Sequence, residues 1–168
     1  LFALASQIPD NWLVVSVRAP FTIASNQFKW YDVELIDKKI TANLNDESKS
    51  RAAILQLIDQ LIGQYLINEN KIVTAGFSQG AIMSLNLALT APDKILAAGC
   101  FSGRLMEEIK PLINNKEALI GKQVFIAHGT QDHMLPLRYL EENRKTLEEL
   151  GIKTTLSLDQ IAHTISSK

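Results

Sequence analysis

The sequence predicts an α/β fold with a mostly parallel sheet, and two observations indicate it. Short apolar, β-branched runs alternate with longer segments in which apolar residues recur every three or four positions. Strands that alternate with helices in this way form a parallel sheet with helices on both faces. In addition, residues 76–80 read Gly-Phe-Ser-Gln-Gly between a strand pattern and a helix pattern. This context is typical of a nucleophile elbow, a sharp turn that exposes a serine hydroxyl above the edge of the sheet.

Length and composition predict a single globular domain over residues 1–168 with a substantial core. The net charge of −1 provides no field that would attract nucleic acid or an anionic membrane. No apolar stretch is long enough for a transmembrane helix. Cys100 is the single cysteine, which excludes an internal disulfide and a Cys-cluster metal site, so we interpret it as a core residue. We expect no cofactor.

The first 44 residues have the weakest periodicity. Residues 1–8 have the pattern of the second half of an amphipathic helix, and residues 12–17 predict a buried strand. Residues 18–44 are interpreted as an ordered loop beside the site, because long irregular connections that carry aromatics are usually functional. Since the chain begins without Met and within a helix-like pattern, we expect further residues upstream of Leu1.

Three aromatic residues of this loop, Phe21, Phe28 and Trp30, are candidate substrate contacts. Apolar rings on a loop after a strand end would form a wall against an acyl or aryl group. The alternative, that the rings fill the core beneath the loop, has equal weight.

The rest of the chain predicts a regular alternation of elements. In order, these are a helix from 45 to about 66, a strand over 71–75, a helix over 81–89, a strand over 95–101, a weak helical segment over 104–120, a strand over 123–127, a helix over about 137–150 and a strand over 153–158. Capping residues and early acids over 45–48 favour a helix start, Pro92 ends the second helix, and Gly151 suits the position after the last one.

Three residues that follow strands of the predicted sheet could carry out acyl transfer. Catalytic groups of parallel sheets gather at the carboxyl ends of the strands. Ser78, Asp132 and His163 occur there in the chain order nucleophile, acid, base. Serine needs a base to take its proton, and that base needs an acid to orient it. The backbone N–H of Gln79, directly after the nucleophile, is predicted to donate to the oxyanion.

Other titratable residues compete for these roles. His128 precedes a glycine at a strand end and is interpreted as structural. His133 adjoins Asp132, and adjacent side chains generally point in different directions. Asp159 is a rival acid, but it lies at the end of the final strand and breaks the chain order.

Three motifs resemble those of the phospholipase/carboxylesterase family of serine hydrolases, which includes the acyl-protein thioesterases. They are the elbow over 76–80, His-Gly-Thr-Gln-Asp over 128–132 with Pro136 beyond it, and His-Thr-Ile over 163–165. The resemblance implies an α/β-hydrolase fold with Ser78, Asp132 and His163 as nucleophile, acid and base. The family's first strands, its His-Gly oxyanion loop and its closing helix have no counterpart in this sequence.

The function expected from these residues is hydrolysis of carboxylic esters of short-to-medium acyl chains by a carboxylesterase-type serine hydrolase. We expect neutral esters to be preferred, because Arg18 and Lys29 are the only cations over residues 18–32. Alternatives are an acyl-thioesterase or lysophospholipase and, from another class, a non-catalytic relative that binds a ligand. The expected partner is a small ester or thioester, in a cytoplasmic protein that could form a homodimer. A leader upstream of Leu1 is compatible with the sequence.

Overall fold

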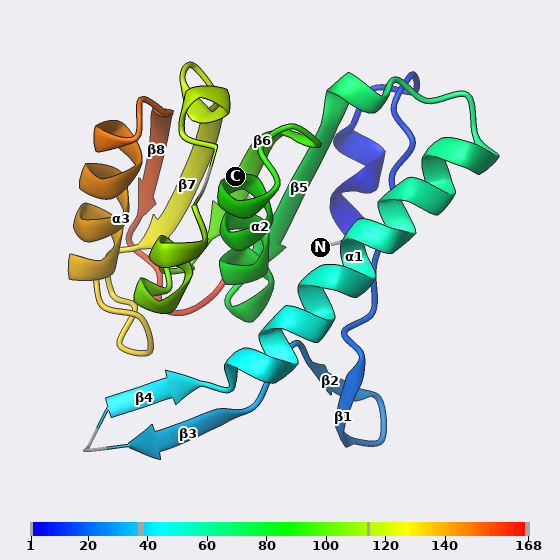
Figure 1. The fold of residues 1–168 in the computed structure, drawn as a ribbon. Coiled ribbons are helices and arrows are strands. Elements are labelled where there is room, and N and C mark those ends of the chain that lie inside the picture. Colours follow the sequence, from blue (N-terminus) through cyan, green and yellow to red (C-terminus); the bar gives the residue numbers. More distant parts are fainter. Residues whose placement is uncertain (1, 37–38, 114, 167–168) are drawn as a thin grey trace. The chain divides into compact units, whose positions relative to one another are not determined.

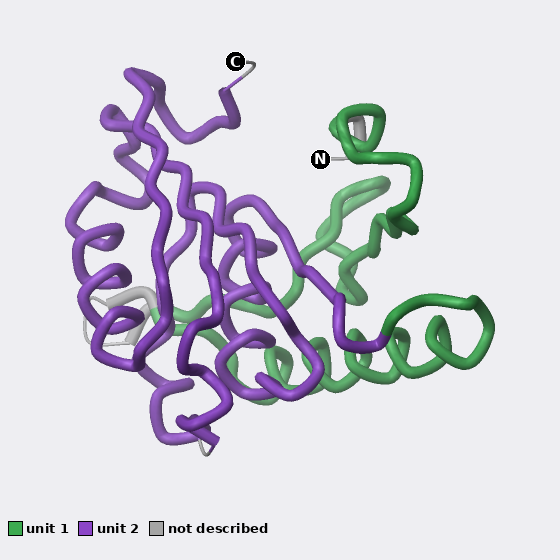
Figure 2. Tube along the Cα trace, turned by 90° about the horizontal axis from the view of Figure 1, so that it is seen from above, with its two compact units in different colours: residues 1–68 green, residues 69–168 purple. Residues whose placement is uncertain are grey.

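The structure is a computed structural model that describes residues 2–36, 39–113 and 115–166. The chain divides into two compact units, residues 1–68 and residues 69–168, which Figure 2 draws in green and purple. A single domain over the whole chain remains a prediction.

The second unit is built on a four-stranded parallel sheet (Figure 1). Its strands are β5 (Ile72–Phe77), β6 (Ile95–Phe101), β7 (Gln123–Gly129) and β8 (Lys153–Asp159). They lie side by side in chain order, and all three pairings are parallel. Every connection therefore crosses from one end of the sheet to the other. The predicted α/β class with a mostly parallel sheet is confirmed.

Two helices of this unit pack against the same face of its sheet. They are α2 (Gln79–Thr90) and α3 (Arg138–Glu149). On this face the Thr74 hydroxyl donates to the Ser84 carbonyl of α2, at 3.4 Å. The strand register places Thr154 of β8 on the same face as Thr74. Leu156 and Leu158, the next alternate residues of β8, therefore share this face, and they line a groove with residues of α3. Right-handed crossovers in a sheet that follows chain order place successive helices on one face. The helices predicted for the opposite face are not among the elements of this unit.

The local sequence explains how each helix is placed. Residues 81–89 of α2 are all buried, as the near absence of charge predicts. Helix α3 buries a single stripe, Leu140, Asn143 and Leu147, and Gly151 follows its C-cap with φ +77°. That left-handed conformation suits glycine, so the predicted helix end is confirmed.

The connections of the second unit include short 3₁₀ turns. These are η2 (Glu69–Lys71), η3 (Glu107–Leu112) and η4 (Glu117–Leu119). The weak helical segment predicted over 104–120 thus forms two 3₁₀ turns instead of an α-helix. Pro111 lies inside η3, where its missing N–H and its ring oppose a longer α-helix.

The first unit contains two antiparallel hairpins and one long helix. Its elements are η1 (Phe2–Gln7), β1 (Phe21–Ala24), β2 (Gln27–Lys29), β3 (Val33–Ile36), β4 (Lys39–Ala42) and α1 (Leu44–Gln64). Helix α1 begins as its capping residues predict, although the N-cap is Asn43, whose side chain accepts from the N–H groups of Asn45 and Asp46.

Three predictions for the first unit are wrong. Residues 12–17 form no strand, and their large apolar side chains are exposed, because no described strand pairs with them. Residues 18–44 are not one irregular loop, because most of them form the two hairpins. The first hairpin turns at Asn26, whose φ of +58° is a conformation that asparagine tolerates. Residues 1–8 form a 3₁₀ helix over their described part, not an α-helix.

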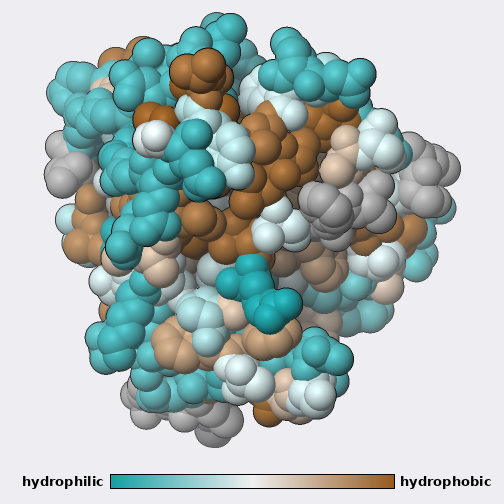
Figure 3. All heavy atoms as spheres, turned by 90° about the vertical axis from the view of Figure 1, so that its right-hand side faces the viewer, coloured by the Kyte–Doolittle hydropathy of each residue, from teal (hydrophilic) through white to brown (hydrophobic). Residues whose placement is uncertain are grey.

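Apolar side chains are not confined to the interior. Figure 3 shows them in patches between hydrophilic residues on the face that it draws. Among the described residues, no helix has the length and apolar character needed to cross a membrane.

Candidate active site

Ser78 lies at a strained turn between β5 and α2. Its φ of +53° and ψ of −118° lie outside the regions that a residue with a Cβ normally occupies. The turn requires close backbone approach, since a Cβ on Gly76 would lie 2.1 Å from the carbonyl of Gly80. The Ser78 N–H donates to the Phe101 carbonyl of β6, at 3.0 Å. The expected strand–turn–helix context of the Gly-x-Ser-x-Gly motif is therefore present.

Ser78, His163 and Asp132 form one continuous hydrogen-bonded chain. His163 Nε2 lies 2.9 Å from Ser78 Oγ, and His163 Nδ1 lies 2.7 Å from Asp132 Oδ2. Because a carboxylate only accepts, Nδ1 carries the proton of the neutral imidazole, and Nε2 accepts from the serine hydroxyl. Asp132 is buried, whereas the His163 side chain is 19% exposed. The imidazole of His163 is thus accessible, and the carboxylate behind it is shielded.

The carboxylate of Asp132 accepts hydrogen bonds from the loop that follows it and from His163. Its Oδ1 accepts from the backbone N–H groups of Met134 and Leu135, both at 2.9 Å, and its Oδ2 accepts from His163. Burial alone would raise the pKa of Asp132, but the hydrogen bonds from Leu135, His163 and Met134 together outweigh it and lower that pKa. The group therefore remains a carboxylate.

His128 supports the same loop from the strand below. Its Nε2 donates to the Leu135 carbonyl at 2.7 Å and lies 3.7 Å from Asp132 Oδ2, and its side chain is fully buried. The contact agrees with the interpretation of His128 as a structural residue. His133 is exposed, and among the described residues no hydrogen bond joins it to Ser78 or Asp132.

The loops that carry the acid and the base are joined through their backbones. The N–H of Thr130 donates to the Asp159 carbonyl at 2.8 Å, and the N–H of Gln131 donates to the Ile161 carbonyl at 3.0 Å. A Cβ on Gly129 would lie 2.3 Å from the Ile161 oxygen and 2.5 Å from that of Ala162. Asp159 thus contributes a backbone carbonyl to this junction, beside the acid loop.

The three strand ends are also linked in sequence along the edge of the sheet. Beyond each strand, a backbone N–H donates to a carbonyl of the next strand: Ser78 to Phe101, Ser102 to Ala127 at 2.8 Å, and Thr130 to Asp159. Ser102 is buried and, like Ser78, has a positive φ, +48°. The three loops at this edge therefore begin with the same kind of backbone hydrogen bond to the next strand.

Sequence reasoning missed the aromatic residue inside the elbow. The Phe77 ring packs on the His163 imidazole, with 4.8 Å between ring centroids and 41° between planes. This contact limits how the imidazole can turn. The signal was present, because the residue before the nucleophile is aromatic, but the sequence alone did not indicate which ring would meet the histidine.

The predicted substrate contacts all belong to the first unit. Phe28 is exposed and the Arg18 guanidinium lies over its ring at 4.9 Å, while Phe21 and Trp30 are half-buried. The Trp30 carbonyl accepts from Ser50 Oγ at 2.5 Å, which ties the loop to α1. Their contact with substrate stays a prediction. Gln79, the predicted oxyanion donor, is the first residue of α2, directly after Ser78.

The hydrogen-bonded chain of the candidate site consists of Ser, His and Asp side chains. Among the described residues, no group of three or more His, Cys, Asp or Glu side chains could hold a metal ion. Cys100 is fully buried in β6, and burial raises the pKa of its thiol to about 12, which suits the predicted core role.

Known proteins share both the sequence pattern and the fold. A family model described as Phospholipase/Carboxylesterase matches residues 9–168. Acyl-protein thioesterase 1 of Emericella nidulans is 28% identical over 136 residues, which cover 74% of this chain and 55% of that protein. Acyl-protein thioesterase 1 of Neurospora crassa is 31% identical over 129 residues, 73% of this chain and 52% of that protein.

A solved structure agrees with these sequence matches. The Bacillus cereus carboxylesterase superposes with a TM-score of 0.75 at 20% identity, over 89% of this chain and 67% of that one. The chain spans about half the length of the curated relatives it matches. With a family model over nearly its whole length and a neighbour of the same architecture, the chain belongs to the phospholipase/carboxylesterase family and has the α/β-hydrolase fold.

Proposed function

We propose that the full-length protein is a serine hydrolase that cleaves carboxylic esters of short-to-medium acyl chains through an acyl-enzyme on Ser78. The observation that supports this most directly is the unbroken chain from Ser78 Oγ through His163 to the buried carboxylate of Asp132. A nucleophile, a base and an orienting acid within hydrogen-bond reach are the requirements of acyl transfer.

In the first half-reaction, Ser78 Oγ attacks the ester carbonyl carbon while His163 Nε2 takes the hydroxyl proton. The carbonyl electrons move to the oxygen, and the backbone N–H of Gln79 donates to this oxyanion at the start of α2. When the tetrahedral intermediate collapses, His163 gives its proton to the departing alkoxide, which leaves as an alcohol. The products of this step are the alcohol and acyl-Ser78.

In the second half-reaction, a water replaces Ser78 as the nucleophile. His163 takes a proton from the water, and the hydroxide attacks the acyl carbon. Collapse of the second intermediate releases the carboxylic acid and returns the proton to Ser78 Oγ. Throughout, Asp132 stays ionised and stabilises the imidazolium, in agreement with its lowered pKa.

A thioesterase activity is the second candidate, because the curated relatives are named acyl-protein thioesterase 1. The same three residues would serve both reactions, with a thiolate in place of the alkoxide as the leaving group. Matched oxygen and sulfur esters of one acyl chain separate the two by their ratio of kcat/KM. A lysophospholipid tested alongside them covers the third alternative.

Labelling with a fluorophosphonate probe, followed by peptide mass spectrometry, tests the proposal. We expect the probe on Ser78 in the full-length protein, and no label on that peptide in Ser78→Ala, because only an activated serine attacks phosphorus at a useful rate. If folded wild-type protein stays unlabelled and hydrolyses neither ester type, the non-catalytic binding function replaces this proposal.

A further inference from the structure

Two arginines lie against one tyrosine ring in the second unit. The guanidinium carbon of Arg138 is 5.0 Å from the centroid of the Tyr139 ring, and that of Arg104 is 6.0 Å from the same centroid. Both distances lie within the range of cation–π attraction. One ring is thus in cation–π range of two guanidinium groups that carry like charges.

Arg104 is held in this place by its neighbours in the chain. Asn143, buried on α3 one turn after Tyr139, accepts from the Leu105 N–H at 2.6 Å and donates to the Gly103 carbonyl at 3.2 Å. The residues on both sides of Arg104 are therefore fixed to the helix that carries the ring. The Arg104 side chain is half-buried, and its Nη1 donates to the Leu105 carbonyl at 3.3 Å. An ordered guanidinium loses less conformational entropy when it binds an anion.

The arginine pair lies at the edge of the sheet where Ser78 emerges. Arg104 follows the carboxyl end of β6, and a Cβ on the preceding Gly103 would lie 2.5 Å from the Cβ of Ala81, in the first turn of α2. The Ala81 N–H in turn donates to the Ser78 carbonyl at 3.0 Å. Arg138 begins α3, six residues after Asp132. Arg104 thus follows a strand of the sheet that carries the candidate site, and Arg138 begins the helix that follows the loop of Asp132.

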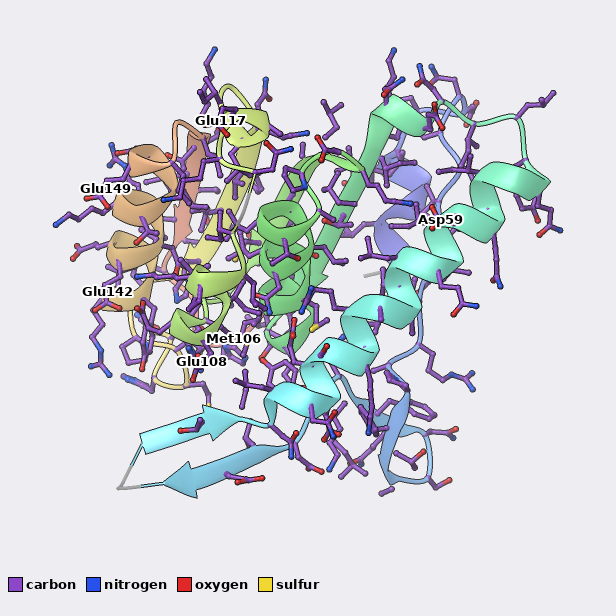
Figure 4. All side chains as sticks on the ribbon, viewed as in Figure 1. Asp59, Met106, Glu108, Glu117, Glu142 and Glu149 are labelled. Atoms are coloured by element: carbon purple, nitrogen blue, oxygen red, sulfur yellow. The ribbon has the colours of Figure 1, made fainter. Side chains whose placement is uncertain are left out.

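Acidic side chains near these arginines form no ion pair with them among the described residues. Glu142, labelled in Figure 4, lies one turn after Arg138 on α3, and among the described residues no ion pair joins the two. Asp132 already accepts hydrogen bonds from backbone N–H groups and His163. Among the described residues, neither Arg104 nor Arg138 belongs to any ion pair. By contrast, Arg144 on the same helix binds Glu148 at 2.7 Å.

We propose that Arg104 and Arg138, arranged around Tyr139, form a subsite for an anionic group of the substrate, a carboxylate or a phosphate. Guanidinium groups bind both through charge-assisted hydrogen bonds. The inference rests on the proposed esterase function and names its substrate class: esters that carry a negative charge away from the scissile bond. It opposes the expectation that neutral esters are preferred, which considered only the cations over residues 18–32, and the experiment below decides between the two.

A matched pair of substrates with one leaving group tests the subsite. The full-length protein is assayed with p-nitrophenyl butyrate, which is neutral, and with mono-p-nitrophenyl glutarate, which ends in a carboxylate. The readout is the ratio of kcat/KM for the anionic ester to that for the neutral ester. We expect this ratio to fall by about tenfold in Arg104→Met/Arg138→Met, since each partly exposed ion pair changes binding a few-fold. High salt lowers the wild-type ratio in the same direction.

Arg144→Met is the matched control, because it removes the same charge from α3 outside the subsite. Its ratio stays within about twofold of wild type. Arg104→Glu, which reverses one charge, lowers the ratio further than Arg104→Met does. Competition by acetate and by inorganic phosphate then shows which of the two anions the subsite binds more tightly.

An unchanged ratio in a double variant that folds and takes the fluorophosphonate label overturns the subsite and leaves the esterase proposal intact. If wild type hydrolyses neither ester and takes no label, the esterase proposal fails, and calorimetric titration with glutarate decides on the subsite. Weaker glutarate binding in the double variant than in Arg144→Met supports it, and equal binding overturns it.

Discussion

The two units of this chain differ in how their strands are supported. In the second unit, four parallel strands form one continuous ladder, and α2 and α3 cover one face of it. In the first unit, the four strands form two separate hairpins, and the large apolar side chains over residues 12–17 are exposed. Ser78, Asp132 and His163 all belong to the second unit. The candidate site is thus found where the backbone is held from several directions at once.

The largest expected effect comes from the base of the second unit. His163→Ala should lower kcat/KM for a p-nitrophenyl ester by on the order of a thousandfold or more, because members of a catalytic triad act as a unit. His133→Ala, a matched histidine change in the exposed part of the acid loop, should stay within about threefold. An inactive His133→Ala together with an active His163→Ala would show that His133, and not His163, is the base.

A pair of glycine substitutions compares the backbone packing of the two units. Gly129→Ala should lower the free energy of unfolding by about 2–4 kcal/mol and reduce activity, because its Cβ would meet the Ile161 and Ala162 carbonyl oxygens. Gly63→Ala, in α1, has nothing within 4 Å of the new Cβ and should raise that free energy by about 0.5–1 kcal/mol. Urea unfolding of both variants measures the contrast. Equal effects would show that the junction at Gly129 tolerates a methyl group.

A smaller effect is expected from the titration of Asp132. Its pKa in the folded state is below the ordinary value of 3.8, so the unfolded state binds more protons and stability increases with pH. The stabilisation is complete above the unfolded pKa and is lost as pH falls through the folded one. Asp132→Asn should therefore flatten the dependence of unfolding free energy on pH between about pH 5 and pH 3. A slope equal to that of wild type would mean that other carboxylates determine the acid transition.

The smallest expected effect concerns the aromatic residues of the first unit. If Phe28 and Trp30 contact the acyl group, kcat/KM should increase less with each added methylene in Phe28→Ala and in Trp30→Ala than in wild type. At medium chain length, we expect kcat/KM of each variant to be about threefold lower than that of wild type. Each buried methylene contributes roughly 0.8 kcal/mol. The measurement is a series of kcat/KM values over acyl length. An unchanged chain-length profile in both folded variants would make this loop part of the scaffold.

The difference between the units also explains which elements could be predicted. The strand over 95–101 was predicted with its observed bounds, because apolar runs between helices have one stable arrangement in a parallel sheet. Residues 12–17 are also mostly apolar but have no described pairing strand, and apolar character does not reveal whether a partner strand exists. The hairpins over 21–42 were missed because their strands are short, those of the first hairpin are largely exposed, and the Asn26 turn lacks the usual glycine.

The candidate site divides in the same way. The elbow motif and the chain order of Ser78, Asp132 and His163 were visible in the sequence, because they depend on residue type and spacing. Phe77 against His163 and the arginines around Tyr139 were not, since such contacts depend on how loops from different strands fold beside one another. Asn143, which fixes the residues on both sides of Arg104, lies some 40 positions from them and carries no motif.

The three hydrogen bonds that link successive strand ends have a consequence for long-range sensitivity. Ser78 is bonded to the end of β6, the residue after β6 to β7, and the residue after β7 to the end of β8. A displacement of β8 is therefore passed through these hydrogen bonds from strand to strand towards Ser78, and small shifts of successive strands add up. We expect substitutions that shift β8, at the far side of the sheet, to reduce the rate at Ser78 while every side chain of the site stays intact.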